Sequence, residues 1–344
     1  MRLTLAALSD LLTLTADTII DVRAPAEFAQ DHLPGAINLP VLDDAERAQV
    51  GTIYKQISHF QARKLGAALV AQNAARHLQG PLADKSGGWQ PLVYCWRGGQ
   101  RSGSFALILS QIGWRVQVLD GGYKAYRRLV TAALYDSAFP SRVVLLDGGT
   151  GSAKTDILQR VAALGGQVLD LEALAGHRGS VFGGSGAQPS QKLFESRLGH
   201  AMARLDPARP VLIEAEANRI GKLRLPPALW AAMVGAMRVR LVAPVAARAA
   251  WSVATYGAFL SDAALLSATL DKLRKLHPRK RIEDWQALAA SGAFLPLAES
   301  LIADHYDPAY AHAAKGFDAE EITLPDLSDE SRDCAARAIL GSLY

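Results

Sequence analysis

A cysteine followed by a glycine-containing loop and two arginines is the first candidate for chemistry in this sequence. Cys95 ends an apolar run and is followed by Trp96, Arg97, Gly98, Gly99, Gln100 and Arg101. A helix is predicted over residues 102–112, so backbone N–H groups and the positive end of a helix dipole would surround the sulfur. Such surroundings favour thiolate over thiol and form a cradle for an anion. We therefore predict that Cys95 is catalytic and that the loop binds an anion; a buried structural cysteine is the alternative.

A second loop has the pattern of a phosphate-binding loop. It consists of Gly148, Gly149, Thr150, Gly151, Ser152, Ala153, Lys154 and Thr155. This nearly matches G-x-x-x-x-G-K-[ST], with an apolar run at 142–147 before it and a helical pattern at 156–164 after it. Backbone N–H groups would surround a phosphate, with Lys154 as a point charge and Thr155 as a potential Mg²⁺ ligand. Ala153 replaces the last glycine, and the loop should survive if this residue keeps helical backbone angles.

Two carboxylates and one basic segment are further candidates. Glu214 and Glu216 stand at the end of a predicted strand, 211–214, where a second acidic motif would approach Mg²⁺; solvated carboxylates are the alternative. The segment 272–281 includes Arg279, Lys280 and Arg281, which we predict to contact nucleic-acid phosphates; an ordinary solvated face is the alternative. No metal site is predicted, because two distant cysteines and scattered histidines lack the spacing of ligands.

The elements that would position these residues indicate two α/β domains. Within residues 1–135, predicted strands at 18–22, 91–95 and 116–119 alternate with helical patterns, which is typical of a parallel sheet covered by helices. A second unit, 141–344, has predicted strands at 142–147, 168–171, 211–214 and 239–242. From about Ala246 onward, an alanine-rich helical pattern predicts an all-helical C-terminal portion.

Composition favours a globular protein of a reducing compartment. The 344 residues are 50% hydrophobic and 20% charged, and the net charge of +4 permits a polyanionic partner. Two cysteines cannot form a disulfide framework. The longest uncharged stretch, 285–298, is shorter than the ~18–20 residues that span a bilayer. We therefore expect a cytoplasmic protein that does not contact a membrane.

Several motifs of the first domain closely resemble the rhodanese family. They are Asp21-Val22-Arg23, Glu27-Phe28, residues 32–40, Cys95 and residues 119–123. The resemblance covers most of residues 1–130 and implies a sulfur or selenium carrier in which Cys95 holds a persulfide or perselenide. It also implies structural roles for Asp21 and His32. Five residues separate Cys95 from Arg101, and this long loop suits a tetrahedral anion such as selenophosphate.

Further strings extend the resemblance to nearly the whole chain. They lie at 170–172, 177–183, 188–191, 194–195, 213–221, 280–285 and 305–310. Together with the rhodanese-like half, they resemble the tRNA 2-selenouridine synthase family. The resemblance implies a transferase that modifies the wobble 2-thiouridine of tRNA. The sulfur would first be S-geranylated by geranyl diphosphate, and selenium from selenophosphate would then replace the geranylthio group.

The same resemblance implies the partners. The co-substrates would be selenophosphate and geranyl diphosphate, without a tightly bound cofactor, and tRNA would be the macromolecular partner. A selenophosphate-producing enzyme is a candidate partner, while the need for Mg²⁺ and the oligomeric state stay open. The main alternative is a P-loop kinase or ATPase with a regulatory rhodanese module. A cysteine phosphatase using Cys95 and Arg101 is disfavoured, because Tyr94 stands where such enzymes usually have histidine.

Overall fold

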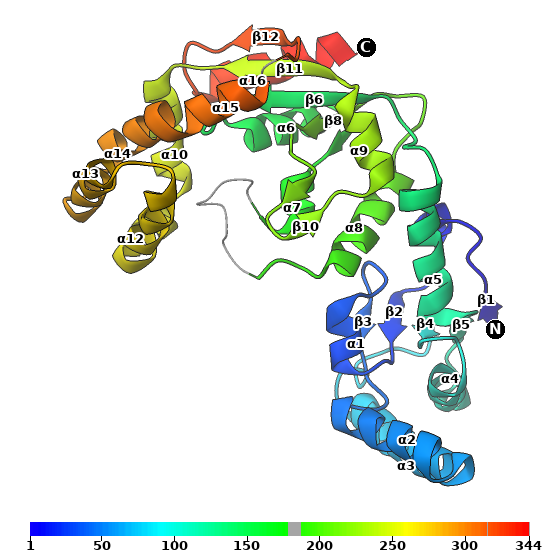
Figure 1. Cartoon of the computed structure of the whole chain (residues 1–344). Helices are drawn as coiled ribbons and strands as arrows, with labels where there is room; N and C mark the ends of the chain where they lie inside the picture. The colour runs from blue at the N-terminus through cyan, green and yellow to red at the C-terminus, as the bar shows by residue number, and fades with distance from the viewer. Residues whose placement is uncertain (178–186, 315, 344) are drawn as a thin grey trace. The chain divides into compact units, whose positions relative to one another are not determined.

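The computed structural model describes residues 1–177, 187–314 and 316–343, which form two compact units (Figure 1). Unit 1 comprises Met1–Ala138, Pro189–Arg204 and Pro226–Ala228, and unit 2 comprises Phe139–Gln188, Leu205–Leu225 and Leu229–Tyr344. The ranges 1–135 and 141–344 stay our proposed division of the sequence, but packing assigns the segment 189–204 to unit 1. Motif residues 178–183 lie outside the described residues.

Unit 1 is built on a five-stranded parallel sheet. Its strands are β1 (Arg2–Leu3), β2 (Thr18–Asp21), β3 (Ile37–Asn38), β4 (Pro91–Tyr94) and β5 (Gln117–Leu119). Their order is β1-β5-β4-β2-β3, and each pair is parallel. The central strand β4 is buried along its whole length, as expected for a strand covered on both faces. The predicted parallel sheet is confirmed.

Helices surround this sheet, and one helix of unit 1 comes from much later in the chain. The helices are α1 (Pro25–Gln30), α2 (Asp44–Gln56), α3 (His59–Gln79), α4 (Gln100–Ile112), α5 (Gly122–Thr131) and α8 (Gln191–Ala203), with short helical turns η1 (Leu8–Thr13) and η2 (Ala132–Asp136). Helix α8 packs on α5, η1 and η2. Gly199 makes this approach close, because a Cβ atom there would lie 3.2 Å from Leu8.

Polar contacts fix α8 in unit 1. The Ser196 hydroxyl donates to Asp31 at 3.0 Å, and the Tyr123 hydroxyl donates to the same carboxylate at 2.7 Å. Glu195 pairs with Arg127 and accepts a hydrogen bond from Tyr135 at 2.8 Å. Asp31, Glu195 and Ser196 are buried, so α8 is bound by specific partners as well as by apolar contact.

Unit 2 contains a second five-stranded parallel sheet. Its strands are β6 (Val143–Gly148), β7 (Val168–Leu169), β8 (Val211–Glu214), β11 (Met237–Val242) and β12 (Glu320–Thr323), in the order β12-β11-β6-β8-β7. A separate antiparallel pair joins β9 (Arg219–Ile220) to β10 (Leu223–Arg224). The expectation of an all-helical portion after Ala246 is wrong at β12, which pairs with β11 at the sheet edge. Two adjacent glutamates in a four-residue strand carry little β signal, so pairing with β11 decides its conformation.

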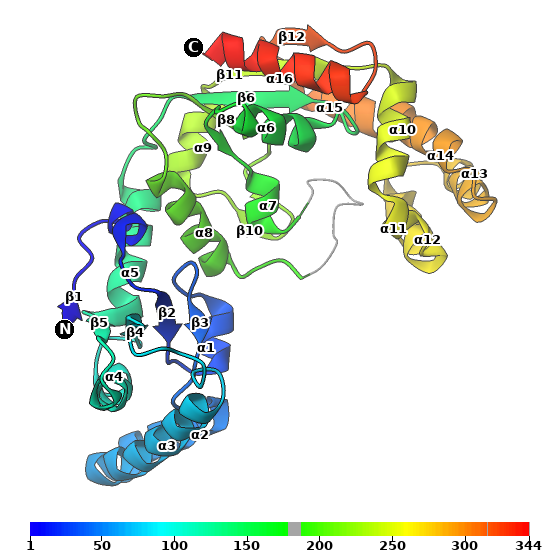
Figure 2. The same ribbon diagram turned by 180° about the vertical axis from the view of Figure 1, so that it is seen from behind.

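The remainder of unit 2 is helical, as predicted. Its helices are α6 (Lys154–Ala163), α7 (Leu171–Ala175), α9 (Pro227–Val234), α10 (Val245–Thr255), α11 (Gly257–Leu260), α12 (Ala263–Asp271), η3 (Lys272–Lys275), α13 (Arg279–Ala290), α14 (Phe294–Leu301), η4 (Ile302–Tyr306), α15 (Asp307–Ala314) and α16 (Asp329–Leu343). Helices α10 to α14 project from the sheet as a group (Figures 1 and 2). This group has its own small core around Leu270, Ile282 and Trp285.

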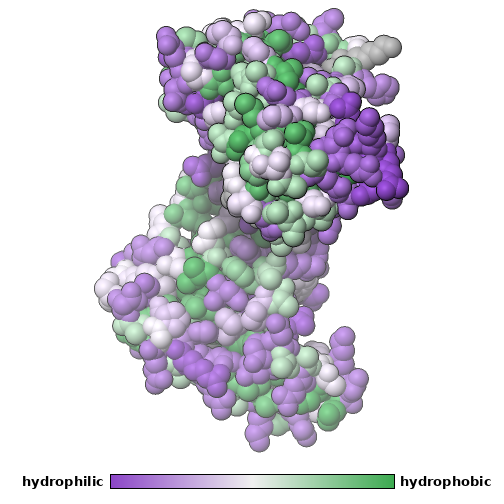
Figure 3. Space-filling view, turned by 90° about the vertical axis from the view of Figure 1, so that its left-hand side faces the viewer, coloured by the Kyte–Doolittle hydropathy of each residue, from purple (hydrophilic) through white to green (hydrophobic). Residues whose placement is uncertain are grey.

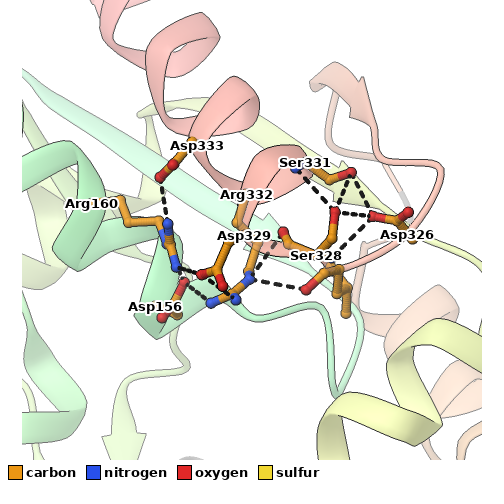
Figure 4. A network of polar contacts seen from close by, with 9 residues as sticks. Asp156, Arg160, Asp326, Ser328, Asp329, Ser331, Arg332 and Asp333 are labelled. Carbon is orange, nitrogen blue, oxygen red and sulfur yellow. Dashed lines mark hydrogen bonds and ion pairs between the residues drawn. The ribbon is translucent and has the colours of Figure 1, made fainter.

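An ion-pair network joins α16 to α6, the helix that follows the phosphate-loop motif (Figure 4). Arg160 pairs with Asp156 at 2.6 Å, with Asp329 at 2.5 Å and with Asp333. Arg332 pairs with Asp156 at 2.5 Å and with Asp329 at 2.8 Å. The two arginines share carboxylates, so the network couples the orientation of α6 to the C-terminal helix.

Within residues 1–177, 187–314 and 316–343, no helix combines the length and the apolar character that crossing a bilayer requires.

Candidate functional site

Cys95 follows β4, and its loop is held by the first residues of α5. The backbone N–H of Tyr123 donates to the Cys95 carbonyl at 2.9 Å, and that of Lys124 donates to the Trp96 carbonyl at 3.0 Å. Gly122 is required by this contact: its φ is +55°, and a Cβ atom there would lie 2.2 Å from the Cys95 oxygen. The loop is thus fixed by α5 on one side and continues directly into α4 on the other.

The surroundings of the Cys95 sulfur favour its thiolate. The residue is only 3% exposed, and the Ser102 hydroxyl donates to Sγ at 3.1 Å. Burial by itself raises the pKa of the thiol. Hydrogen bonds from the Ser102 hydroxyl and from the backbone N–H groups of Ser102 and Arg97, together with the charge of Arg101, outweigh this and lower the pKa below its usual value. These contacts surround the sulfur with hydrogen-bond donors, and the binding of an anion by this loop stays a prediction.

The two arginines of the loop have different surroundings. Arg101 donates to Glu27 at 3.0 Å, and the same carboxylate pairs with Arg47 at 2.8 Å. Burial acts to raise the pKa of Glu27, but the nearby charges of Arg101 and Arg47 and the hydrogen bonds lower it overall. The side chain of Arg97 is exposed, and its backbone N–H donates a hydrogen bond to the Cys95 sulfur. Arg101 is therefore held in place by an acidic partner while its charge still acts on Cys95.

A pocket beside this loop was not predicted from the sequence. It has a volume of ≈ 460 Å³ and is lined by Trp96, Tyr123, Lys124, Arg127, Arg128 and Lys192, with Asp136 as its acidic member. The Trp96 and Tyr123 ring centroids are 5.2 Å apart. Aromatic rings with cations are the combination that holds bases and phosphates of RNA. The sequence gives little indication of this pocket, because Lys192 belongs to α8, which lies far from the Cys95 loop along the chain.

The rhodanese-like motif residues upstream of Cys95 form ion pairs, stacking contacts and hydrogen bonds within unit 1. Asp21 and Arg23 form a buried ion pair at 2.6 Å, and the Arg23 guanidinium lies 4.0 Å from the centre of the Tyr123 ring. The His32 ring stacks on Phe28 at a centroid distance of 3.9 Å, and its Nδ1 lies 2.9 Å from the Phe28 carbonyl oxygen. These contacts agree with the structural roles that the resemblance implied for Asp21 and His32.

The phosphate-loop motif joins β6 to α6, as its pattern predicted. The Lys154 ammonium donates to the Gly148 carbonyl at 2.6 Å, so it lies across the loop. Ala153 does not keep right-handed helical angles: its φ is 57° and its ψ is 27°, which is the left-handed region. Among the described residues it is the one non-glycine with positive φ. Ala153 thus takes up a backbone conformation that is strained for an L-residue, at the position where the motif usually has glycine.

Carboxylates gather next to this loop. Glu214 is buried, and burial with the nearby Asp170 and Glu172 raises its pKa to about 9. Burial and Glu172 likewise raise the pKa of Glu216 to about 7, against the opposing charge of Lys154. Thr155 donates to Glu172 at 3.1 Å. Within the described residues, no group of three or more His, Cys, Asp or Glu has the arrangement of a metal site.

The basic residues predicted to contact RNA lie at the start of α13. Arg279 and Arg281 are exposed but paired, Arg279 with Glu283 at 2.6 Å and Arg281 with Asp304 at 3.1 Å. Lys280 is exposed between them. Figure 3 looks onto the helical group and shows a hydrophilic area beside apolar residues. The structure thus places the three cations on one exposed helix start, and their contact with RNA stays a prediction.

Together, the fold and the two loops define a class of protein, in which a rhodanese-like unit is combined with an α/β unit of the P-loop type. Family models agree: the rhodanese-like domain matches residues 4–129, and the tRNA 2-selenouridine synthase AAA domain matches residues 141–272. A tRNA 2-selenouridine synthase of Chromohalobacter salexigens is 33% identical over 335 residues, which is 90% of this chain and 91% of the relative. The chain belongs to the tRNA 2-selenouridine synthase family.

Other relatives are matched over a smaller share of their length. A tRNA 2-selenouridine synthase of Nitrosomonas europaea is 41% identical over 217 residues, 61% of this chain and 56% of the relative. The chain thus spans little more than half of that relative. Among solved structures, a rhodanese-related protein from Thermoplasma volcanium is 19% identical with a TM-score of 0.23, covering 36% of this chain and 88% of that one.

Proposed function

We propose that this protein is a transferase that converts the wobble 2-thiouridine of tRNA to 2-selenouridine in two steps. The observation that carries the proposal is the hydrogen bond from the Ser102 hydroxyl to the Cys95 sulfur, which favours the thiolate, in the same chain as a phosphate-loop motif. The family to which the chain belongs supports the same reaction. We place the reaction in the cytoplasm, where thiols stay reduced.

In the first step, the sulfur of 2-thiouridine attacks C1 of geranyl diphosphate. The carbon–oxygen bond breaks, diphosphate leaves, and the base loses its N3 proton as S-geranyl-thiouridine forms. The developing charge on the diphosphate needs neutralising, and the loop amides with Lys154 would supply this. The step requires orientation and charge relief but no protein nucleophile.

In the second step, selenium from selenophosphate adds to C2 of the base. The geranylthio group leaves as a thiolate and is protonated, and phosphate is released when water cleaves the phosphorus–selenium bond. Alkylation makes this exchange feasible, because a thiocarbonyl sulfur is a poor leaving group whereas its alkylated form is a good one. The Cys95 loop would hold selenophosphate beside the activated carbon, so that its selenium attacks C2 directly.

Mg²⁺ and protein partners belong to the same proposal. The oxygen groups of Thr155, Glu172 and Glu216 fit the preference of Mg²⁺ for oxygen ligands, and Glu216 carries a raised pKa that a cation would relieve. If the ion binds, Thr155 and Glu216 would hold it, and it would neutralise diphosphate charge. Transfer of labile selenophosphate would benefit from contact with the enzyme that makes it.

Two variants test the proposal in a tRNA assay by nucleoside mass analysis. Lys154→Ala should abolish S-geranyl-thiouridine, whereas Cys95→Ala should block selenation and let S-geranylated tRNA accumulate. Cys334→Ala is the matched control and should change neither step, because Cys334 is exposed and far from both loops in sequence. Normal selenation by a folded Cys95→Ala protein would contradict the division of roles. ATP turnover without tRNA would instead favour a P-loop kinase or ATPase.

A further inference from the structure

An apolar pocket in unit 2 opens beside the phosphate loop. Its lining includes Thr150 of the loop and Ser252 and Val253 of α10, and its apolar wall is completed by Phe259, Leu260, Leu266, Phe294, Leu297 and Leu301. The pocket is narrow, with a volume of ≈ 60 Å³. Its apolar wall is continuous with the core of the helical group, to which Leu266, Leu297 and Leu301 also belong.

The pocket and the phosphate loop share one support, helix α10. Arg248 donates from Nε to the Thr150 carbonyl at 2.9 Å and pairs with Asp307 at 2.6 Å. Gly149 and Gly151 rest on this helix so closely that a Cβ atom on either would lie 2.6 Å from an Arg248 atom. One turn further along α10, Ser252 and Val253 line the pocket. A phosphate held by the loop would therefore have an apolar pocket next to it.

We infer that this pocket binds the isoprenoid chain of geranyl diphosphate while the loop binds its diphosphate. The inference rests on the proposed function, and it adds the site at which the isoprenoid chain of the substrate binds. A ligand with an anionic head and an apolar tail matches the two surfaces, because the loop offers N–H groups and Lys154 and the pocket offers aliphatic and aromatic side chains. Thr150 lies where the two surfaces meet, so the reacting C1 atom would be placed there.

The same lining disfavours a nucleotide in this place. A nucleoside diphosphate bound by the loop with its sugar and base in the pocket would bring hydroxyl and amine groups against Leu297, Leu301 and Phe294. Burying such groups without hydrogen-bond partners is costly. The pocket thus acts as a specificity element that selects a prenyl diphosphate over ATP or GTP.

Calorimetric binding to the wild-type protein tests the inference without turnover. Geranyl diphosphate should bind about 100-fold more tightly than inorganic diphosphate, because the buried chain adds apolar contact. Dimethylallyl diphosphate, with five carbons fewer, should bind at least tenfold more weakly than geranyl diphosphate, and ATP should not bind more tightly than inorganic diphosphate. Equal affinities for geranyl diphosphate and inorganic diphosphate would overturn the inference.

A substitution that fills the pocket tests its location. Ala298 lines the pocket from α14, and Ala298→Trp should weaken binding of geranyl diphosphate at least tenfold while binding of inorganic diphosphate stays unchanged. Leu295→Trp is the matched control, because Leu295 lies on the same helix with its side chain exposed. Val253→Phe fills the pocket from α10 and should act like Ala298→Trp. Unchanged geranyl diphosphate affinity in both filled variants, with intact diphosphate binding, would overturn the inference.

Failure of the inference and failure of the proposed function give different results. If the pocket is misassigned but the function is right, wild-type protein geranylates thiolated tRNA and the filled variants do so with an unchanged KM for geranyl diphosphate. If the function is wrong but the pocket binds prenyl chains, the binding series holds while no S-geranyl-thiouridine forms on tRNA.

Discussion

The hydroxyl of Ser102 donates a hydrogen bond to the sulfur of Cys95 at 3.1 Å, and both residues are buried. Ser102 belongs to the first turn of α4, whose amides point in the same direction. A buried thiol would ordinarily resist ionisation, so this contact helps decide whether Cys95 is a nucleophile or a structural residue.

The first prediction concerns this hydrogen bond. Ser102→Ala should raise the pKa of Cys95 by about 1 to 2 pH units, because a hydrogen bond to a charged group contributes about 1.5–3 kcal/mol. The pH dependence of iodoacetamide alkylation measures it, in a Cys334→Ala background that leaves Cys95 as the single thiol. Ser110→Ala, exposed on the same helix, is the control and should leave the profile unchanged. An unaltered profile for Ser102→Ala would remove Ser102 from thiol activation.

The second prediction concerns Ala153, which has a left-handed backbone at φ 57°. Ala153→Gly should relieve about 1–2 kcal/mol of strain. It would lose about 0.8 kcal/mol of methyl burial and about 0.5–1 kcal/mol to chain entropy, so the gain and the losses nearly cancel and the free energy of unfolding should change by less than about 0.8 kcal/mol. Ala287→Gly, in an exposed interior turn of α13, should lose about 1 kcal/mol. Equal losses in urea unfolding for both variants would argue against strain at position 153.

The third prediction concerns Glu214, whose pKa is raised to about 9 from 4.5. Between these two values the folded protein keeps a proton that the unfolded chain has released, so this residue makes stability highest at low pH and lowers it as pH rises toward 9. Glu214→Gln should remove this decline, and the variant should gain stability relative to wild type at pH 8 in Mg²⁺-free buffer.

Urea unfolding at several pH values checks the Glu214 prediction. Glu216→Gln is the comparison. Because the pKa of Glu216 is raised only to about 7, the loss of stability that this residue causes should be complete at a lower pH than the loss caused by Glu214. A wild-type protein and a Glu214→Gln variant with parallel pH profiles would show that Glu214 is ionised in the folded state across this range.

The fourth prediction concerns the start of α13. Replacing Arg279, Lys280 and Arg281 with alanine should weaken tRNA binding and reduce its salt slope by roughly one unit for each phosphate that the protein no longer neutralises. Because Arg279 is paired with Glu283 at 2.6 Å, Glu283→Gln should free it and strengthen tRNA binding. Filter binding at several salt concentrations measures both. A salt slope unaffected by the triple substitution would identify this helix start as an ordinary solvated surface.

The sequence by itself determined the two loops and their flanking elements. The Cys95 loop and the phosphate loop each consist of consecutive residues. Their glycines and the apolar runs beside them are local signals that do not depend on the tertiary context. The predicted strands at 18–22, 91–95 and 211–214 correspond to β2, β4 and β8, because buried parallel strands are read as short apolar runs.

Tertiary structure decided the features that depend on residues far apart in the chain. Helix α8 joins unit 1 because Ser196 and Glu195 find Asp31 and Arg127 there, and its own pattern gives no hint of that choice. Strand β12 forms because β11 offers an open edge. The apolar pocket beside Thr150 needs α10, α12 and α14 to pack together. Sequence patterns report each segment's own preference, whereas these features follow from long-range contacts that form only when the chain folds.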